Sequence, residues 1–380
     1  MLVQQDEVRC DSSRFGKLGI IVMQGCEEIG HQIDDILKEW RLDNDGFIIS
    51  SSCPRFTNGE GKAVINQSVR GCDIFIICDC YNYSVKFKMY DMDVPMSPDT
   101  HYRDLLRIIS ALSGKPKRIN VIMPRLYGGR QDKRISRESL DCAMSLQELA
   151  GMGVSNILTF DAHDPMVQNA IPLTGFDTIM PSYQMIKALY DNVDDIELTS
   201  DKALIISPDE GAMRRSMHYS SMLGDLALST FYKRRDYSRV VEGRNSILSH
   251  IFLGSEQEVK GKDVILVDDI MATGESIIGV AELLKEMGAK RIFIFVTFGE
   301  FSHGTDLFDK AYQNGIVDRI FVAATTYKPD KIKQKKWFCD VDMSKYLARL
   351  IDTLNCDVSI SRLLTPKQRI NELVNSHKKN

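Results

Sequence analysis

The stretch from Val264 to Ser276 constrains the fold of this chain more than any other. It begins with four apolar residues, Val264–Val267, a pattern typical of a strand that is buried on both faces of a parallel sheet. Two adjacent carboxylates, Asp268 and Asp269, follow the strand, and a short turn comes next. Apolar residues at helical spacing then predict an amphipathic helix over about 277–287, which a glycine ends. The stretch therefore predicts a strand, a polar turn and a helix in an α/β protein.

The turn itself is built from small, hydroxyl-bearing or acidic residues: Ala272, Thr273, Gly274, Glu275 and Ser276. Free N–H groups at the start of a helix point at a bound anion, and the helix dipole favours negative charge there. Asp268 and Asp269 repel phosphate but accept hydrogen bonds from vicinal hydroxyls. The predicted ligand is therefore a sugar phosphate, although ordinary turn chemistry also places Asp-Asp and Thr-Gly at such junctions.

Composition sets the broad class of protein. A length of 380 residues is enough for two domains, and 43% hydrophobic with 26% charged residues is typical of globular proteins. A net charge of -4 argues against nucleic-acid binding, which requires a basic face. The apolar runs are only strand-length, so we expect no membrane segment. Residues 1–16 do not resemble a signal peptide, and nine scattered cysteines predict reduced thiols in a cytoplasmic protein.

Strand patterns alternate with helical patterns along most of the chain, which predicts parallel sheets covered by helices on both faces. The predicted strands of the first half are Leu18–Met23, Gly46–Ser50, Asp73–Cys78, Asn120–Met123 and Asn156–Phe160. The pattern starts again after a boundary near Gly175–Pro181, with strands at Lys202–Ser207, Leu226–Thr230, Val264–Val267, Arg291–Thr297 and Arg319–Ala323. The polar segment 236–262 breaks this rhythm and is predicted to be a mobile loop. Helical patterns follow at Met343–Asn355 and after Thr365-Pro366, an N-cap with proline in the first turn.

Four further stretches carry residues suited to chemistry. Arg55–Glu60 offers Phe56 to stack on a purine and Asn58 and Glu60 to hydrogen-bond it, although a solvated turn has the same composition. Arg130, Gln131 and Asp132 follow a strand, where open α/β sheets bind ligands, although a solvated charge run would look alike.

The third stretch ends in His163, which again follows a strand. A histidine at this position suits a hydrated Mg2+ that has few direct protein ligands, although a lone histidine is more often structural. The fourth runs from Ile206 to Arg215 and contains Asp209, Glu210, Gly211, Arg214 and Arg215. A strand followed by an acid, a glycine turn and two arginines suits a polyphosphate, because arginine forks bind its oxygens.

The Asp268–Ser276 run resembles the ribose-phosphate-binding signature of the phosphoribosyltransferase superfamily. With the four other stretches, in this order, the chain resembles the ribose-phosphate pyrophosphokinase family from about Lys17 to Leu364. The resemblance implies two tandem phosphoribosyltransferase-like domains, residues 1–178 and 179–364, followed by an extension, residues 365–380. It also implies a homo-oligomer, dimer-based or hexameric, in which residues of the base loop, Arg55–Glu60, reach a neighbour's site.

The same resemblance assigns roles to residues. Phe56, Asn58, Glu60, Arg130, Gln131 and Asp132 would contact ATP, and His163 and Asp209 would lie near Mg2+. Asp209, Glu210, Gly211, Arg214 and Arg215 would form the pyrophosphate loop, and Lys233 and Arg235 the catalytic pair. Asp268, Asp269, Ala272, Thr273, Gly274, Glu275 and Ser276 would bind ribose 5-phosphate.

The implied reaction is Mg-dependent transfer of pyrophosphate from ATP to ribose 5-phosphate, which gives 5-phosphoribosyl 1-pyrophosphate and AMP. Departures from the family pattern leave alternatives open. Ala272 replaces an acid, which is closer to a phosphoribosyltransferase that consumes the product, and Glu210 replaces a small residue. A catalytically silent paralogue that regulates an active synthetase is the other alternative, against which Lys233 and Arg235 argue. Residues 136–139 lack the proline that the family pattern has nearby, which puts family-type regulation by phosphate and ADP in doubt. The effectors and the nucleotide preference stay open.

Overall fold

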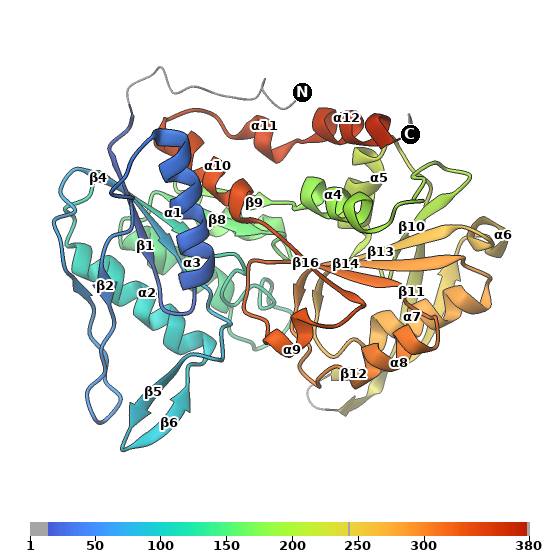
Figure 1. Cartoon of the computed structure of the whole chain (residues 1–380). Helices are drawn as coiled ribbons and strands as arrows, with labels where there is room; N and C mark the ends of the chain where they lie inside the picture. Colours follow the sequence, from blue (N-terminus) through green and yellow to red (C-terminus); the bar gives the residue numbers. More distant parts are fainter. Residues whose placement is uncertain (1–13, 242–243, 378–380) are drawn as a thin grey trace. The chain divides into compact units, whose positions relative to one another are not determined.

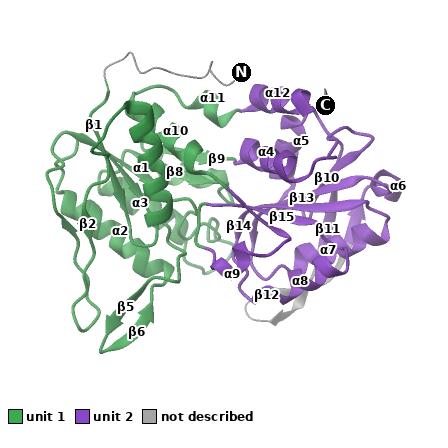
Figure 2. Cartoon of the chain, in the orientation of Figure 1, with its two compact units in different colours: residues 1–180, 325–327, 342–365 green, residues 181–324, 328–341, 366–380 purple. Residues whose placement is uncertain are grey.

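Two mainly parallel sheets organise the chain, one in each of two units (Figures 1 and 2). The computed structural model describes residues 14–241 and 244–377, with the backbone alone described for 234–241 and 244–250. Unit 1 holds the chain up to Met180 together with 325–327 and 342–365, and unit 2 holds 181–324, 328–341 and the chain from Pro366 onward. Each unit is therefore built from segments that are distant in the sequence.

The sheet of unit 1 has five parallel strands in the order β1-β4-β7-β8-β9. Their bounds are β1 (Lys17–Val22), β4 (Cys72–Ile77), β7 (Arg118–Ile122), β8 (Asn156–Phe160) and β9 (Gly175–Ile179). The helices of this unit are α1 (Glu27–Arg41), α2 (Pro98–Leu112), α3 (Asp141–Gly151), the 3-10 helix η1 (Pro165–Ala170), α10 (Ser344–Asn355) and α11 (Ser361–Leu364). Every residue of β4 is buried, as a central strand of a covered parallel sheet requires.

Two small antiparallel hairpins complete unit 1. The first pairs β2 (Ser51–Ser52) with β3 (Val64–Ile65), and the second pairs β5 (Lys86–Met89) with β6 (Met92–Pro95). The predicted strand at Gly46–Ser50 is wrong, because only an isolated bridge from Ile48 to Ile20 forms there. Gly46 has a φ of +78°, and the Phe47 N–H donates to Asp34 Oδ1 at 2.6 Å, so pairing with β1 is limited to the hydrogen bonds from Ile20 N to Phe47 O and from Ile49 N to Ile20 O.

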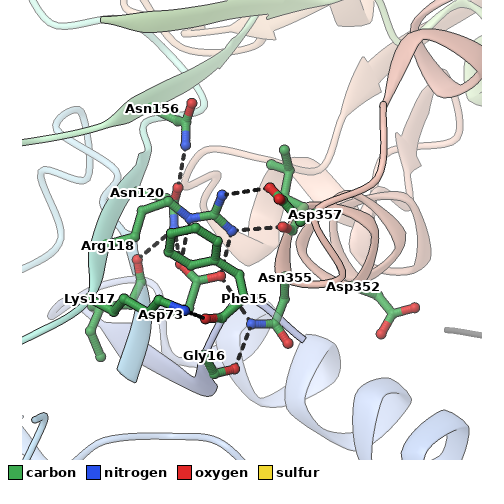
Figure 3. A network of polar contacts seen from close by, with 12 residues as sticks. Phe15, Gly16, Asp73, Lys117, Arg118, Asn120, Asn156, Asp352, Asn355 and Asp357 are labelled. Carbon is green, nitrogen blue, oxygen red and sulfur yellow. Dashed lines mark hydrogen bonds and ion pairs between the residues drawn. The ribbon is translucent and has the colours of Figure 1, made fainter. Parts of the chain in front are cut away.

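A buried polar network joins the start of β4 and β7 to the end of α10 (Figure 3). The fully buried Asp73 carboxylate accepts hydrogen bonds from Arg118 Nε and Nη2, at 2.8 and 2.6 Å. Asn120 Nδ2 donates to the same carboxylate at 2.8 Å, and Asn355 Nδ2 donates at 3.0 Å. Since a buried charge must be paired and hydrogen-bonded, this network fixes residues from the C-terminal part of the chain onto the first sheet.

The sheet of unit 2 has seven strands in the order β12-β11-β10-β13-β14-β15-β16. Their bounds are β10 (Ala203–Ser207), β11 (Leu228–Val241), β12 (Arg244–Leu253), β13 (Asp263–Met271), β14 (Arg291–Gly299), β15 (Arg319–Ala323) and β16 (Phe338–Val341). All pairs are parallel except β11 with β12. The helices of this unit are α4 (Ser182–Asn192), α5 (Met213–Met222), α6 (Glu256–Val259), α7 (Glu275–Glu286), α8 (Asp306–Gln313), α9 (Asp330–Lys333) and α12 (Lys367–His377).

Both predicted sheets and the α/β fold class are confirmed. The segment 236–262, predicted to be a mobile loop, has regular secondary structure in most of the backbone that the structure describes there. Most of this segment continues β11, returns as β12 and then forms α6. The two strands pair antiparallel with register shifts at Arg234/Arg235 and Asp236/Val240, a pairing that sequence composition alone did not reveal.

The C-terminal helix α12 packs on α4 and α5 within unit 2. Its Ile370 and Val374 are buried, the Arg369 guanidinium lies 4.3 Å from the centre of the Tyr183 ring, and the His377 and Tyr190 rings stack at 4.3 Å. The helix therefore covers an apolar face next to the helix that follows β10.

The described cysteines are mostly free thiols, namely Cys26, Cys53, Cys72, Cys78, Cys80, Cys142 and Cys339. Cys356 is disulfide-bonded, so the prediction of reduced thiols is wrong at that position. Over the described residues, the helices are all too short or too polar to cross a bilayer.

Candidate active site

The turn after β13 has a conformation that only glycine tolerates at position 274. Gly274 is the N-cap of α7, with a φ of +87°, in the left-handed region that favours glycine. A Cβ at this position would lie 2.2 Å from Cζ of Phe308, which is buried on α8. Local strain and the aromatic core beneath the turn therefore both require this glycine.

Three carbonyl groups at this turn accept hydrogen bonds from backbone N–H groups of the protein. Met271 O accepts from Glu300 N at 2.8 Å, Ala272 O accepts from Ser302 N at 3.0 Å, and Gly274 O accepts from Ile278 N at 2.9 Å. The N-cap makes no side-chain hydrogen bond to the helix, and the first N–H groups of a helix have no acceptor within it. This arrangement leaves N–H groups, rather than carbonyls, available at the start of α7, which is the geometry of an anion site.

The acidic pair at the end of β13 is held by one buried arginine. Arg215 Nη2 lies 3.1 Å from Asp269 Oδ2, and Arg215 Nη1 lies 3.7 Å from Asp268 Oδ1. Arg215 and Asp269 are both buried, whereas a quarter of the Asp268 side chain is exposed. Burial and the neighbouring Asp269 raise the pKa of Asp268 well above its ordinary value, although Arg215 lowers it. The ionised form of Asp268 is therefore disfavoured at this position, beside the turn.

A lysine joins the turn to the loop after β10. Lys233 Nζ on β11 donates to Ser276 Oγ at 2.9 Å and lies 3.8 Å from Asp209 Oδ2. Asp209 also shapes its own loop, because its Oδ1 accepts from the Ala212 N–H at 3.1 Å. The structure thus brings together three residues that were predicted from separate stretches of sequence.

The remaining predicted residues of unit 2 lie around this group. Glu210, Gly211 and Arg214 are exposed on the loop and first turn that precede Arg215. Glu275 is exposed, and its N–H lies 3.4 Å from Thr273 Oγ1. The backbone of Arg235 belongs to β11, opposite Ile247 on β12, but its side chain is outside the described part of the structure.

In unit 1 the predicted base-binding residues lie at the tip of the β2–β3 hairpin. The Phe56 N–H donates to Glu60 O at 2.7 Å, which closes the tip, and 55% of the Phe56 surface is exposed. Asn58 Nδ2 donates to Glu60 Oε2 at 2.9 Å. The Phe56 ring therefore lies at the surface, where a base could stack on it, with Lys62 Nζ 5.8 Å from the ring centre.

The predicted residues after β7 meet His163 after β8. His163 Nδ1 lies 2.7 Å from Asp132 Oδ2, and the Asp132 side chain is nearly buried while 40% of the histidine side chain is exposed. Gln131 Nε2 donates to Ser139 O at 3.0 Å, which ties down the same loop, and Arg130 is exposed. A carboxylate on Nδ1 orients the ring and leaves Nε2 facing outward.

These residues fit Mg2+ that arrives with phosphate groups. Among the residues that the structure describes, no three His, Cys, Asp or Glu side chains form a ready metal-binding group. Mg2+ is typically held by one or two carboxylates together with waters and substrate phosphates, so a closed protein cage is not required. Asp209 offers such a carboxylate, and the outward nitrogen of His163 can bind a metal or its water shell.

Some supporting residues were not predicted from the sequence. Phe308 beneath Gly274, and the Arg55–Asp104 ion pair at 2.5 Å beneath the base loop, come from other elements. The spacing of residues in the sequence predicts neither contact, since both depend on how helices pack on the sheets.

Comparison with known proteins gives matches along most of the chain. Residues 18–153 match the family model "N-terminal domain of ribose phosphate pyrophosphokinase", and residues 178–329 match "Phosphoribosyl transferase domain". The chain is 27% identical over 316 residues to a ribose-phosphate pyrophosphokinase of Vibrio parahaemolyticus, across 82% of this chain and 90% of the relative. It is 28% identical over 318 residues to that of Shewanella oneidensis, across 82% and 89%.

Among solved structures, the phosphoribosylpyrophosphate synthetase of Mycobacterium smegmatis matches with a TM-score of 0.71 and 24% identity, over 89% of this chain and 98% of the other. This likeness supports the two-sheet fold. The chain belongs to the ribose-phosphate pyrophosphokinase family.

Proposed function

We propose that this enzyme makes 5-phosphoribosyl 1-pyrophosphate by Mg-dependent transfer of pyrophosphate from ATP to ribose 5-phosphate. The anomeric oxygen attacks the β-phosphorus of ATP, the bond from that phosphorus to the α,β-bridging oxygen breaks, and AMP leaves with the oxygen. The anomeric hydroxyl loses its proton to solvent. Such transfers depend on positioning and on neutralising charge, rather than on covalent catalysis.

The sugar phosphate is assigned to unit 2. The N–H groups at the start of α7, with Thr273 and Ser276, bind the 5-phosphate. Asp268 and Asp269 accept hydrogen bonds from the ring hydroxyls, and Arg215 holds the two carboxylates in place. The raised pKa of Asp268 means that hydroxyl donors relieve an unfavourable charge there.

The nucleotide is assigned to residues of both units. Phe56 stacks on the base while Asn58 and Glu60 hydrogen-bond it, and Arg130, Gln131 and Asp132 contact ATP. Asp209, Glu210, Gly211, Arg214 and Arg215 form the pyrophosphate loop, and Lys233 and Arg235 neutralise charge on the phosphate that is transferred. Asp209 of unit 2 and His163 of unit 1 are the residues that we propose for Mg2+, which would supply charge neutralisation and orientation.

One observation carries the proposal. Lys233 Nζ contacts Ser276 of the sugar-phosphate turn at 2.9 Å and lies 3.8 Å from Asp209 of the pyrophosphate loop. A single cation therefore stands between the positions proposed for the acceptor phosphate and for the donor polyphosphate. A phosphoribosyltransferase that consumes the product would not need the base loop of unit 1, so that alternative leaves Phe56 unexplained.

The test is AMP formation by the purified full chain with ATP labelled in the adenine ring, Mg2+ and ribose 5-phosphate, without added base. AMP that appears only with ribose 5-phosphate, in equal amount with phosphoribosyl pyrophosphate, supports the proposal. ATP binding without AMP formation identifies a silent paralogue, and activity that requires a base identifies a phosphoribosyltransferase. We also propose a homo-oligomer, dimer-based or hexameric, which light scattering of the same sample tests.

A further inference from the structure

The base-loop tip, residues 55–61, is an ordered structure before any nucleotide binds. Arg55 and Gly61 form an antiparallel bridge, and the Gly59 N–H donates to Phe56 O at 2.9 Å. The Glu60 N–H donates to Asn58 Oδ1 at 3.1 Å. Because a two-stranded hairpin is only marginally stable alone, its conformation depends on what supports it.

One support comes from α2. Arg55 Nη1 and Nη2 donate to the two oxygens of Asp104, at 2.8 and 2.5 Å, and both side chains are almost fully buried. Arg107 Nη1 donates to the same carboxylate at 2.7 Å. This buried bidentate pair fixes the beginning of the tip but does not reach its far end.

The second support is the β5–β6 hairpin, which lies beside the tip (Figure 1). The Tyr90 N–H donates to Thr57 O at 2.8 Å. Met89 packs on Gly59, where a Cβ would lie 2.9 Å from Met89 Sδ, and Gly59 has a φ of +90°. The Arg55 guanidinium also lies 5.0 Å from the centre of the Phe87 ring. The β5–β6 hairpin therefore contacts the tip at Arg55, Thr57 and Gly59.

The two faces of the β5–β6 hairpin differ. Phe87, Met89 and Val94 are half-buried, and Phe87 pairs with Val94 across the strands. On the other face Lys88 pairs with Asp93, where an ion pair of 2.8 Å joins side chains that are 67% and 59% exposed. Residues Tyr90 and Asp91 turn the chain with φ of +48° and +62°, the signs of a type I′ turn. One face thus supports the tip while the other faces solvent.

We infer that the β5–β6 hairpin positions the base-loop tip for the base of the nucleotide substrate, with Phe87 and Met89 as positioning residues. The inference rests on the proposed function, in which Phe56, Asn58 and Glu60 contact the base. Neither positioning residue needs to touch the nucleotide. They keep the tip in its binding conformation, so that binding does not incur the entropic cost of ordering it.

The experiment compares Phe87→Ala/Met89→Ala with Lys88→Ala/Asp93→Ala, a matched pair of changes on opposite faces of one hairpin. Calorimetry measures the Kd for α,β-methylene-ATP with Mg2+, an analogue whose α,β bridge cannot be cleaved, and kinetics measures both KM values. We expect the inner-face variant to weaken analogue binding and raise the KM for ATP about tenfold. Its kcat and its KM for ribose 5-phosphate should stay within about twofold of wild type. The outer-face variant should match wild type.

Two outcomes overturn the inference: an unchanged Kd in the inner-face variant, or equal losses in both variants. A conservative single change, Met89→Leu, should retain wild-type binding, which distinguishes support of the tip from general damage to folding. Failure of the proposed function would appear as wild-type protein that binds the analogue but forms no AMP from ATP and ribose 5-phosphate. The Kd comparison would still decide the role of the β5–β6 hairpin.

Discussion

Lys233 shows how single residues combine roles that the sequence assigned to separate stretches. It was predicted from the resemblance to the ribose-phosphate pyrophosphokinase family, and the structure adds its contacts with Ser276 and Asp209. With substrates bound, phosphate oxygens would compete for the ammonium group, which is already in place and only 12% exposed. A cation fixed in this way is preorganised for transition-state charge.

We therefore predict that Lys233→Ala lowers kcat by about 100- to 1000-fold, equivalent to about 3–4 kcal/mol, because one preorganised cation is lost. The KM for ribose 5-phosphate should change far less. Steady-state assays of AMP formation measure both values, with the exposed Lys202→Ala as the matched control. Turnover near wild type in Lys233→Ala would remove this residue from the mechanism.

The acidic pair allows a prediction on pH. The pKa of Asp268 is raised in the folded protein above its ordinary value of 3.8 by burial and by Asp269, so its ionised form is disfavoured by folding. The stability that this group contributes is present below the ordinary pKa and is lost as pH rises through the raised value.

Asp268→Asn, which removes that charge, should consequently raise the Tm of the ligand-free protein at pH 7.5. The gain should vanish near pH 4, where Asp268 is protonated, and ribose 5-phosphate binding should be lost at both pH values. Asp269→Asn is the control, because Asp269 lies 3.1 Å from Arg215 Nη2 and its loss should lower Tm. Differential scanning calorimetry across this range provides the measurement. An equal or lower Tm for Asp268→Asn at pH 7.5 would contradict the electrostatic account.

At the scale of elements, α12 is a C-terminal extension that joins the core of unit 2. One face carries the buried Ile370 and Val374, and the opposite face is exposed. Since α12 contacts both α4 and α5, it supports the helix from which Arg215 reaches the acidic pair.

Ile370→Ala should lower the free energy of unfolding by ~2–4 kcal/mol, because a fully buried side chain is removed and a cavity is left. The neighbouring exposed Asn371→Ala should change it by less than about 0.5 kcal/mol. Chemical denaturation followed by circular dichroism measures both. Equal stabilities of the two variants would show that α12 does not pack as described.

At the scale of the whole molecule, the base of the nucleotide and the sugar phosphate are assigned to different units. The base loop belongs to unit 1, and the sugar-phosphate turn belongs to unit 2. This division predicts that variants of each unit affect different kinetic constants. Phe56→Ala should raise the KM for ATP about tenfold, because stacking of a base on an aromatic ring is worth ~1–3 kcal/mol.

The KM for ribose 5-phosphate should remain within about twofold in that variant. Phe56→Tyr, which keeps an aromatic ring, is the matched control and should retain most of the affinity for ATP. Initial rates with each substrate varied in turn separate the two constants. A rise in both constants for Phe56→Ala would show that the base loop does more than bind nucleotide.

The sequence by itself determined the two parallel sheets, because the local spacing of apolar residues indicates buried strands and amphipathic helices. It also determined the turn at Gly274 and the positions of Asp268 and Asp269, since strand, turn and helix are consecutive in the chain. Composition did not reveal the pairing of β11 with β12, and the strand pattern wrongly predicted a strand at Gly46–Ser50.

Only the tertiary structure decided which residues support the site. Phe308 fills the space that a side chain at 274 would need, Arg215 holds the acidic pair, and Asp104 anchors the base loop through Arg55. These partners are distant in sequence, and their contacts follow from how strands and helices pack. A local pattern specifies the conformation of a segment, whereas burial, charge pairing and steric fit between segments exist only after the chain has folded.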